Sequence, residues 1–444
     1  KHVKQLLQLL KIPETRQRIF VTLWLLLAYR VGFHIPIPGL NPSFLKEQAS
    51  GSTAFGLLSA FSGGSIGNTV IFALGIMPYI SASIIFSVLA KVSPQIEAIQ
   101  KEGATGHKKI NQWTRLITVP IALVQSTFIW FGLFADKSKG LLLGDPTVGM
   151  ALTVIMALTA GSMFCMWLGE LITEYGLGNG SSLIIMAGII ATMPGGVNGI
   201  IKQQDEPYNA ILTLLSIWFA IVVLVVFMQK GERRVPIQYA KLARGRRVYG
   251  GQRHYLPLKI NMAGVMPIIF ASAIFIIPGV LFGVIGMERL AAVFNDQDGF
   301  VHVTLQVVLV IFFCFFRNNL MFRPEEMADN LREHGSFIPG IRPGAKTAVY
   351  LKDILNRITL TGAVFLAFLA VLPNFITGNV QGLDGQLAYF LGGTSVLIVV
   401  GVAMDMVDRL NAQLVMRNYE GFVKGKGTGS AGGLTGGAGW ANKN

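Results

Sequence analysis

The sequence predicts an all-α polytopic membrane protein: ten transmembrane helices in two pseudo-symmetric, inverted five-helix halves around a central pore. Three observations predict this class. The 444-residue chain is 52% hydrophobic and only 14% charged, with a mean hydropathy of +0.55, whereas soluble domains carry about 25% charged residues. Long apolar runs recur along the chain. Lys and Arg are concentrated in alternate loops between those runs.

Each apolar run predicts one helix, because about 20 mainly apolar residues span the hydrocarbon core. The fifth and ninth runs are short, so we expect these helices to be tilted, shielded by neighbours or extended by polar ends. In chain order the runs cover residues 20–37, 70–90, 113–134, 150–171, 182–193, 210–228, 262–285, 303–321, 360–372 and 387–404.

The loops predict the orientation. The segment 230–259 holds nine Lys or Arg residues against one acid, Glu232, and the N-terminal segment and the loops 91–115 and 323–357 are also basic. By the positive-inside rule these segments and both termini are cytoplasmic. The alternation is consistent for all ten spans. The loops that carry few positive charges are 38–69, 135–148, 195–208, 286–302 and 374–386.

The spans divide five and five around one external loop, so the two halves enter the membrane from opposite sides. This pseudo-symmetry is typical of proteins with a pathway at the interface of the halves, although no letter-by-letter repeat supports it. The predicted units are a cytoplasmic segment 1–19, the N-terminal half 20–194, a hinge loop 195–208, the C-terminal half 209–412 with cytoplasmic loops 231–258 and 323–357, and a cytoplasmic tail 413–444 that is Gly-rich from about 424.

The centres of the predicted spans contain almost no charged residues. Arg30, Glu170, Arg317 and Asp405 lie towards span ends, whereas ion-coupled transporters usually keep a charge at the bundle centre. No phosphate-binding loop, metal-ligand cluster or nucleophile–base pair is present. The sequence therefore predicts no catalytic residue, metal site or cofactor, and energy for transport has to come from a partner.

Two isolated features of the spans leave alternatives open. Cys165 and Cys314 lie in apolar runs and are expected to pack as small hydrophobic side chains rather than as a disulfide or metal site. Gln125 is the deepest polar group, with Ser81, Ser83 and Ser272 as lesser candidates.

Two pairs of isoleucines, Ile76 with Ile80 and Ile185 with Ile189, share a helix face by their i, i+4 spacing. The pairs fit ordinary packing, and they also fit a ring that closes an aqueous path by excluding water. The segment 54–61 is apolar but too short to span, which suits a re-entrant element. The abundant glycines fit either turns and close packing or hinge and plug motion.

Several motifs resemble the SecY/Sec61α translocon family, and the bacterial branch matches best. They occur in family order over about residues 16–420. The matching runs are FSGG at 61–64, IFALGIMPYISASI at 71–84, KEG at 101–103, ITEYGLGNG at 172–180, YAK at 239–241, GRRVY at 245–249, LPLKINMAGV at 256–265, ADNL at 328–331 and IPGIRPG at 338–344.

The resemblance implies a passive hourglass channel for unfolded secretory and membrane proteins. A ring of aliphatic side chains closes the channel, a short plug lies at about 54–64, and a lateral gate between helices 2 and 3 and helices 7 and 8 opens to lipid. The implied ring is Ile76, Ile80, Ile185, Ile189, Ile269 and Ile398, and the implied plug residues are Phe55, Leu57, Leu58, Phe61, Gly63 and Gly64. The implied gate residues are Ser81, Ser83, Gln125, Asn261 and Ser272.

The same resemblance implies a set of partners and a location in the bacterial inner membrane. The partners are the small membrane subunits SecE and SecG, the ATPase SecA, the ribosome with its rRNA, signal-bearing polypeptides, membrane lipid, and SecDF and YidC. Energy comes from the ATPase, the ribosome or the proton motive force. Docking falls on Lys241, Arg244, Arg246, Arg247 and Arg342, although the same charges also serve to set topology and contact lipid headgroups.

Two other functions remain open on the sequence alone. One is an ion-coupled transporter of small solutes, against which the lack of a central carboxylate argues. The other is a membrane insertase or scaffold without a continuous pore. The tail from Lys424 onward matches nothing in the family and is expected to be a flexible linker.

Overall fold

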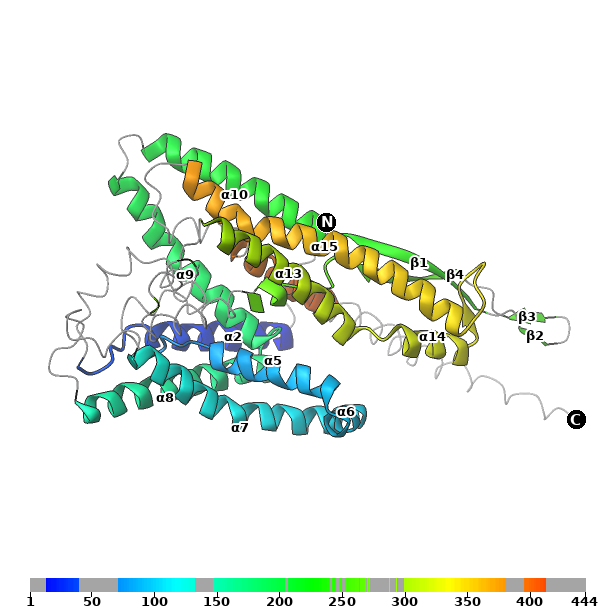
Figure 1. Ribbon diagram of the computed structural model, residues 1–444, viewed down its shortest axis with the longest axis horizontal. Helices are drawn as coiled ribbons and strands as arrows, with labels where there is room; N and C mark the ends of the chain where they lie inside the picture. The colour runs from blue at the N-terminus through cyan, green and yellow to red at the C-terminus, as the bar shows by residue number, and fades with distance from the viewer. Residues whose placement is uncertain are drawn as a thin grey trace, which may run out of the picture.

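The computed structural model is a bundle of long helices that run roughly along one direction, with a β-hairpin projecting from one end (Figure 1). The residues that the structure describes are 13–39, 71–131, 147–203, 207–239, 242–244, 247–249, 253–262, 264–268, 270–271, 287, 293, 299–379 and 395–412.

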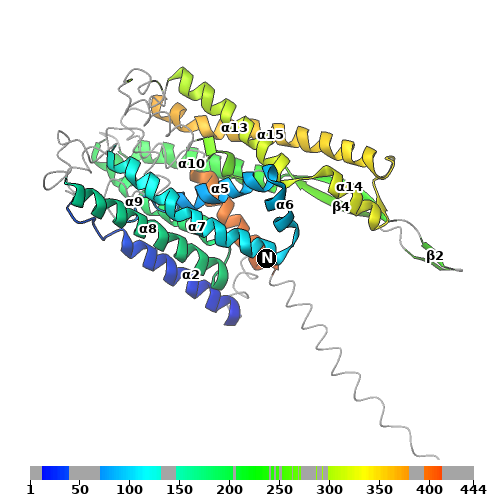
Figure 2. The same ribbon diagram turned by 60° about the horizontal axis from the view of Figure 1, so that its bottom comes forward.

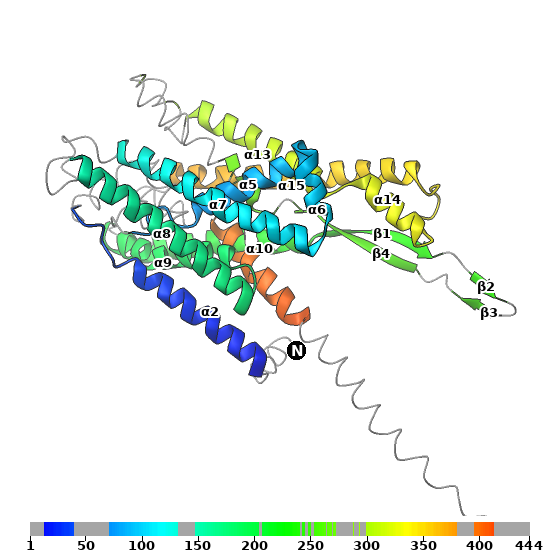
Figure 3. The same cartoon turned by 90° about the horizontal axis from the view of Figure 1, so that it is seen from below.

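The helices form two groups. The first group contains α2 (Pro13–Gly32), α5 (Met77–Val92), α6 (Pro94–Lys101), α7 (Ala104–Ile129), α8 (Val148–Tyr175) and α9 (Gly180–Gln203). The second contains α10 (Pro207–Lys230), α13 (Phe300–Met321), α14 (Pro324–Glu333), α15 (Ala345–Asn379) and the helical residues 395–412. Figures 2 and 3 show the same groups from other sides.

Several of these helices are long and apolar enough to cross a membrane. Over the described ranges, four pass by length and composition: Val148–Tyr175, Ile211–Lys230, Phe300–Glu333 and Ala345–Leu372. Met77–Ala90 and Pro94–Lys101 pass together as a pair bent by 99°. The predicted helical membrane fold is confirmed, and the number of ten spans stays a prediction.

A described helix overlaps every predicted span except the seventh, of which only parts of 262–271 are described. The two spans that looked short are extended by polar ends, since α9 has 24 residues and α15 has 35. Helix α9 runs on through Pro194 to Gln203, so most of the predicted hinge loop 195–208 is helical. Proline is tolerated in such helices because neighbouring groups satisfy the freed backbone.

The second predicted span begins later than its apolar run suggests. Residues 71–76 form turns, and α5 starts only at Met77. Gly75 has a φ of 53°, a left-handed conformation that glycine adopts without strain. Pro78 then stands at the helix start, where its missing N–H is no loss.

The basic segment 231–258 is folded, whereas the sequence predicted a plain loop. Strand β1 (Glu232–Tyr239) pairs antiparallel with β4 (Arg253–Lys259), and β5 (Ser336–Phe337) pairs with the other edge of β1. Beyond them, β2 (Leu242–Arg244) pairs with β3 (Arg247–Tyr249). Val235 and Ile237 are buried and alternate with more exposed neighbours, and Val235 packs in an apolar cluster with Leu258, Ile338 and Leu351 of α15.

The hairpin, α6 and α14 all lie at one end of the bundle, which we call the basic end (Figure 1). Each helix group has its own apolar core. One core joins α2, α5, α8 and α9, and the other joins α10, α13 and α15. Residues 395–412 contribute to both, so this helix packs between the two groups.

Candidate functional site

Five isoleucines from three helices lie together in one apolar cluster. We call Ile76, Ile80, Ile185, Ile189 and Ile398 the isoleucine cluster, and none of them is more than 8% exposed. Ile76 and Ile80 belong to α5 and its start, Ile185 and Ile189 to α9, and Ile398 to the helix 395–412. The structure thus brings together five of the six predicted ring residues. The sixth, Ile269, lies outside the described residues.

The backbone explains how each pair shares a face. The Ile80 N–H donates a hydrogen bond to the Ile76 carbonyl at 3.1 Å, so Ile76 stands one turn before Ile80 even though it precedes the helix proper. Ile185 and Ile189 are one turn apart in α9. Leu168 and Ile172 of α8 pack behind the cluster.

Close contact between α8 and α9 holds the second pair in place. A Cβ atom added at Gly180 would lie 1.8 Å from the carbonyl oxygen of Gly169, so only glycine permits this approach. A Cβ at Gly169 would meet Ile76 Cδ1 at 3.2 Å. The Gly180 N–H donates to Thr173 Oγ1 at 2.9 Å, which satisfies one free donor at the start of α9. Gly180 therefore serves close helix packing, whereas Gly178, with a φ of 94°, serves the turn between α8 and α9.

A neutral polar contact joins α5 and α7. Gln125 Nε2 approaches Ser81 Oγ at 3.5 Å, and Ser81 Oγ donates to the Met77 carbonyl at 3.0 Å. Within the described part of the chain, Gln125 Oε1 is buried and has no hydrogen-bond partner. The backbone carbonyl of Ser83 accepts from Ser87 Oγ at 2.7 Å. Three of the predicted gate residues thus lie on these two adjacent helices.

The fourth gate residue, Asn261, lies beside α15. A Cβ at Gly362 would be 2.8 Å from the Ile260 carbonyl oxygen and 3.9 Å from Asn261 Cα. The buried Asn261 Oδ1 has no hydrogen-bond partner among the residues described. Thr359, three residues before Gly362 in α15, accepts a hydrogen bond from Asn318 Nδ2 of α13. The fifth gate residue, Ser272, is outside the described ranges.

The predicted docking residues lie at the basic end where they are described. Arg342 is exposed between β5 and α15, and its carbonyl accepts a hydrogen bond from Thr347 Oγ1 at 3.0 Å. Arg244 and Arg247 are backbone register partners in the β2–β3 pair. Lys241, Arg246 and the plug residues Phe55, Leu57, Leu58, Phe61, Gly63 and Gly64 lie outside the described residues.

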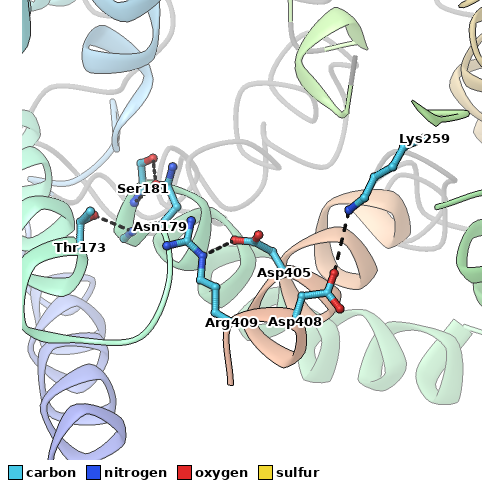
Figure 4. A network of polar contacts seen from close by, with 8 residues as sticks. Thr173, Asn179, Ser181, Lys259, Asp405, Asp408 and Arg409 are labelled. Atoms are coloured by element: carbon cyan, nitrogen blue, oxygen red, sulfur yellow. Dashed lines mark hydrogen bonds and ion pairs between the residues drawn. The ribbon is translucent and has the colours of Figure 1, made fainter. Parts of the chain in front are cut away.

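A polar network lies near the basic end where the two groups meet (Figure 4). Arg409 Nε contacts Asp405 at 3.0 Å, and Lys259 at the end of β4 lies 4.0 Å from Asp408. In the α8–α9 connection, Ser181 Oγ donates to Asn179 Oδ1 at 2.6 Å.

Buried Leu177 and Leu410 pack together close to this network. They join the α8–α9 connection to the end of the helix 395–412, so the two helix groups are in apolar contact here as well.

An ion pair that the sequence did not predict joins the two helix groups. Arg323 Nη2, at the α13–α14 junction, lies 2.7 Å from Glu97 Oε1 in α6. Arg323 also pairs with Glu326, and Glu97 with Lys101 at 3.3 Å. The hydrogen bond from Lys101 lowers the pKa of Glu97, and the charges of Lys101 and Arg323 lower it further.

The cysteines behave as predicted. Cys165 and Cys314 are free thiols buried in the two cores. Glu170 of α8 forms an ion pair with Arg115 of α7. Over the described ranges, no three His, Cys, Asp or Glu side chains are grouped to hold a metal ion.

Comparison with known proteins gives concordant results. The family model described as SecY matches residues 70–407. The chain is 41% identical over 435 residues to a protein named protein translocase subunit SecY from Streptomyces scabiei, covering 93% of this chain and 98% of the relative. It is 39% identical over 445 residues to the protein of the same name from Mycobacterium bovis, covering 94% and 98%.

Solved structures share the fold. One titled "The structure of a protein conducting channel" has a TM-score of 0.62 at 21% identity, covering 92% of this chain and 96% of that chain. Sec61 in a canine ribosome-channel complex from the endoplasmic reticulum has a TM-score of 0.60 at 20% identity, with the same coverage.

Proposed function

The chain belongs to the SecY family, and from this premise we propose that it is the pore-forming subunit of a protein translocase. It conducts unfolded polypeptides across the membrane and releases apolar segments sideways into lipid. The observation that carries the proposal is the isoleucine cluster, a buried apolar cluster to which both the first helix group and the helix 395–412 contribute.

The physical logic needs no active site. A polar chain cannot cross hydrocarbon, because each unsatisfied backbone group costs several kcal/mol. A hydrated path removes that cost, and branched aliphatic side chains close around any sequence without binding it. In the closed state they exclude water and thereby ions. The channel is passive, and a partner ATPase, a ribosome or the proton motive force supplies the energy.

We place the lateral gate between α5 and α7 on one side and residues 262–285 and α13 on the other. The Gln125–Ser81 contact supports a neutral polar lining on the first side. A segment that enters this gate gains about −0.3 to −0.6 kcal/mol for each Leu or Ile at the centre of a helix in lipid. The gate thus sorts segments by their partition energy. The plug is assigned to 54–64 and the hinge between the inverted halves to 195–208, of which 195–203 are helical.

In this proposal the basic end is cytoplasmic, as are both termini, and the membrane is the bacterial inner membrane. Its arginines suit the phosphates of rRNA and the acidic surface of a motor ATPase. The relatives' name, protein translocase subunit, supports an assembly of more than one subunit, and we propose the small membrane subunits SecE and SecG as its other members. SecA, the ribosome, and SecDF and YidC are the proposed soluble and membrane partners.

Site-specific photocrosslinking tests the proposal. A photoreactive residue is placed at Ile76, Ile185 or Ile398, and a secretory precursor is stalled during export through the reconstituted translocase. Each of the three positions is expected to crosslink to the stalled chain. A probe at Phe219, an exposed aromatic residue of α10, is the matched control and is expected to crosslink to lipid only.

Two results would count against the proposal. Crosslinks at none of the three isoleucines would exclude this cluster from the path of the polypeptide. Proton- or sodium-dependent uptake of a small solute by the purified chain in vesicles would favour the ion-coupled transporter instead.

A further inference from the structure

The Glu97–Arg323 ion pair joins the two helix groups on the side where α5 contacts α13. Glu97 lies in α6, which turns 99° away from α5 at the basic end. Arg323 occupies the N-cap position of α14, directly after α13 ends at Met321. Figure 3 shows α6 crossing near the α13–α14 junction. A contact between these two short segments therefore bridges the ends of two membrane-spanning helices from different groups.

The pair belongs to a chain of four alternating charges. Lys101 contacts Glu97 at 3.3 Å, Glu97 contacts Arg323 at 2.7 Å, and Arg323 also pairs with Glu326. The side chains of Arg323 and Glu97 are only 24% and 31% exposed. The outer contacts are local, within α6 and within α14. The central contact is the one that crosses between the helix groups.

We infer that the Glu97–Arg323 pair is a latch that sets how apolar a segment must be before the lateral gate opens. This inference rests on the proposed function. Moving α5 and α6 away from α13 and α14 separates the two charges and exposes both to water. The closed state is thus favoured by whatever net free energy the pair contributes, and a segment entering the gate has to offset it.

The expected size of the effect is modest and measurable. A partly exposed ion pair shifts a two-state equilibrium by up to about fivefold. One Leu or Ile added to a segment shifts its partition into lipid by about twofold. Losing the latch is therefore equivalent to adding about two leucines to a signal sequence. The latch makes Glu97 and Arg323 specificity-determining residues although neither touches the segment.

The test compares two precursors in vesicles that contain the complete reconstituted translocase. One precursor carries an intact signal sequence and the other a signal that lacks two leucines. The ratio of weak-signal to intact-signal export is measured for the wild type, Glu97→Gln, Arg323→Gln and the double variant. Each single variant is expected to raise the ratio by about two- to fivefold. The double variant is expected to raise it no further, because either change alone breaks the pair.

Arg332→Gln is the matched control, since Arg332 is an exposed arginine in the last turn of α14 and should leave the ratio unchanged. An unchanged ratio in both single variants overturns the latch, as does a double variant whose effect is the product of the two single effects. Equal change in the export of both precursors also overturns it, because a docking or folding defect acts on both. If the wild-type assembly exports neither precursor, the proposed function itself fails.

Discussion

Ile398 and its chain neighbour Leu397 have different surroundings although they occupy adjacent positions of one helix. Ile398 packs in the isoleucine cluster with residues of the first helix group. Leu397 is fully buried in the core of the second group, with Leu366 of α15 and Val310 of α13. The same substitution at the two positions therefore separates a role in closing the channel from a role in stability.

Replacing Ile398 with Asn is expected to increase ion leak. The amide places a polar group in a constriction that excludes water only while its lining is apolar. Export of precursors with defective signal sequences should also rise. The measurements are ion conductance in planar bilayers and export of a weak-signal precursor.

Leu397→Asn provides the matched comparison. It buries the same amide and should lower the free energy of unfolding by about 2–5 kcal/mol. The ion conductance of the protein that stays folded should not rise. Equal conductance in the Ile398 variant and the wild type would contradict the closing role of the cluster.

The stabilising effect of Glu97 is expected to depend on pH. Its pKa in the folded protein lies below the ordinary value of 4.5, chiefly because Lys101 donates a hydrogen bond to it. A lowered folded pKa gives stability that is present above about pH 4.5 and is lost as the pH falls through the folded value. Wild type should therefore melt at a higher temperature than Glu97→Gln at pH 7, and the difference should shrink as the pH falls below the ordinary pKa of 4.5 and through the lowered folded value.

The melting temperature of the detergent-solubilised protein, followed from pH 7 to pH 3, checks this expectation. Glu333→Gln, at an exposed position of α14, is the control. A wild-type advantage that stays constant over the whole pH range would show that Glu97 acts through something other than its charge.

At the scale of elements, the contact between α8 and α9 depends on glycine. Gly180→Ala is expected to force the helices apart, because the new methyl group meets a backbone carbonyl that cannot rotate away. The cost of such overpacking is about 1–3 kcal/mol. Because α9 carries Ile185 and Ile189, the shift should also raise ion conductance. Thermal unfolding and bilayer conductance are the two measurements.

Gly149→Ala is the matched control for this prediction. Gly149 lies in the first turn of α8, and a Cβ there would meet nothing within 4 Å. This variant should be neutral or stabilised by up to about 1 kcal/mol, because alanine favours helix. Equal stability of the two alanine variants would show that α8 and α9 do not need their close approach.

The sequence predicts the helices well because about 20 apolar residues in a row have few other structures available in lipid. It predicts their ends less well. Gly75 and Pro78 delay the start of α5, while Pro194 fails to end α9. These outcomes depend on neighbouring helices that satisfy or crowd the backbone, and a window of sequence does not contain those neighbours.

The sequence did not predict the hairpin at the basic end, because the many Lys and Arg residues of this segment were interpreted as those of a cytoplasmic loop. The signal was present: Val235 and Ile237 alternate with Arg234, Pro236 and Gln238, which is the pattern of a strand with one buried face. The partner strand repeats it with Leu256 and Leu258.

For the site, spacing alone could pair isoleucines within one helix but could not bring α5, α9 and the helix 395–412 together. That step came from the resemblance, and the structure places five of the six implied residues in one buried cluster, while their role as a ring stays a prediction. The Glu97–Arg323 pair had no local signal, because its two residues are far apart in the chain and each also has a local partner.

At the scale of the whole molecule, the formal net charge of +14 is unevenly placed, since the segment 230–259, which forms the hairpin at one end, holds nine Lys or Arg residues against one acid. Arg342→Glu is expected to reduce partner-driven export by about fivefold or more while the fold stays intact, since reversing a docking charge costs affinity. The measurement is ATPase-driven export together with binding of ribosomes or motor at several salt concentrations.

Lys352→Glu, an equally large charge change at an exposed site on α15, is the control and should export normally. Binding of the wild type should weaken as salt rises, and the Arg342 variant should show a smaller salt dependence. Normal export by Arg342→Glu would remove this residue from the docking surface.

The length of α15 has a mechanical consequence. Its 35 residues form one helix that begins three positions after Arg342, packs under the hairpin through Leu351 and Leu355, and continues into the core of the second group through Leu366 and Leu369. At 1.5 Å per residue it is a rod about 50 Å long. A stiff rod does not absorb a sideways push at its tip. It tilts as one piece, so a displacement of the hairpin is carried directly into the core of the second helix group.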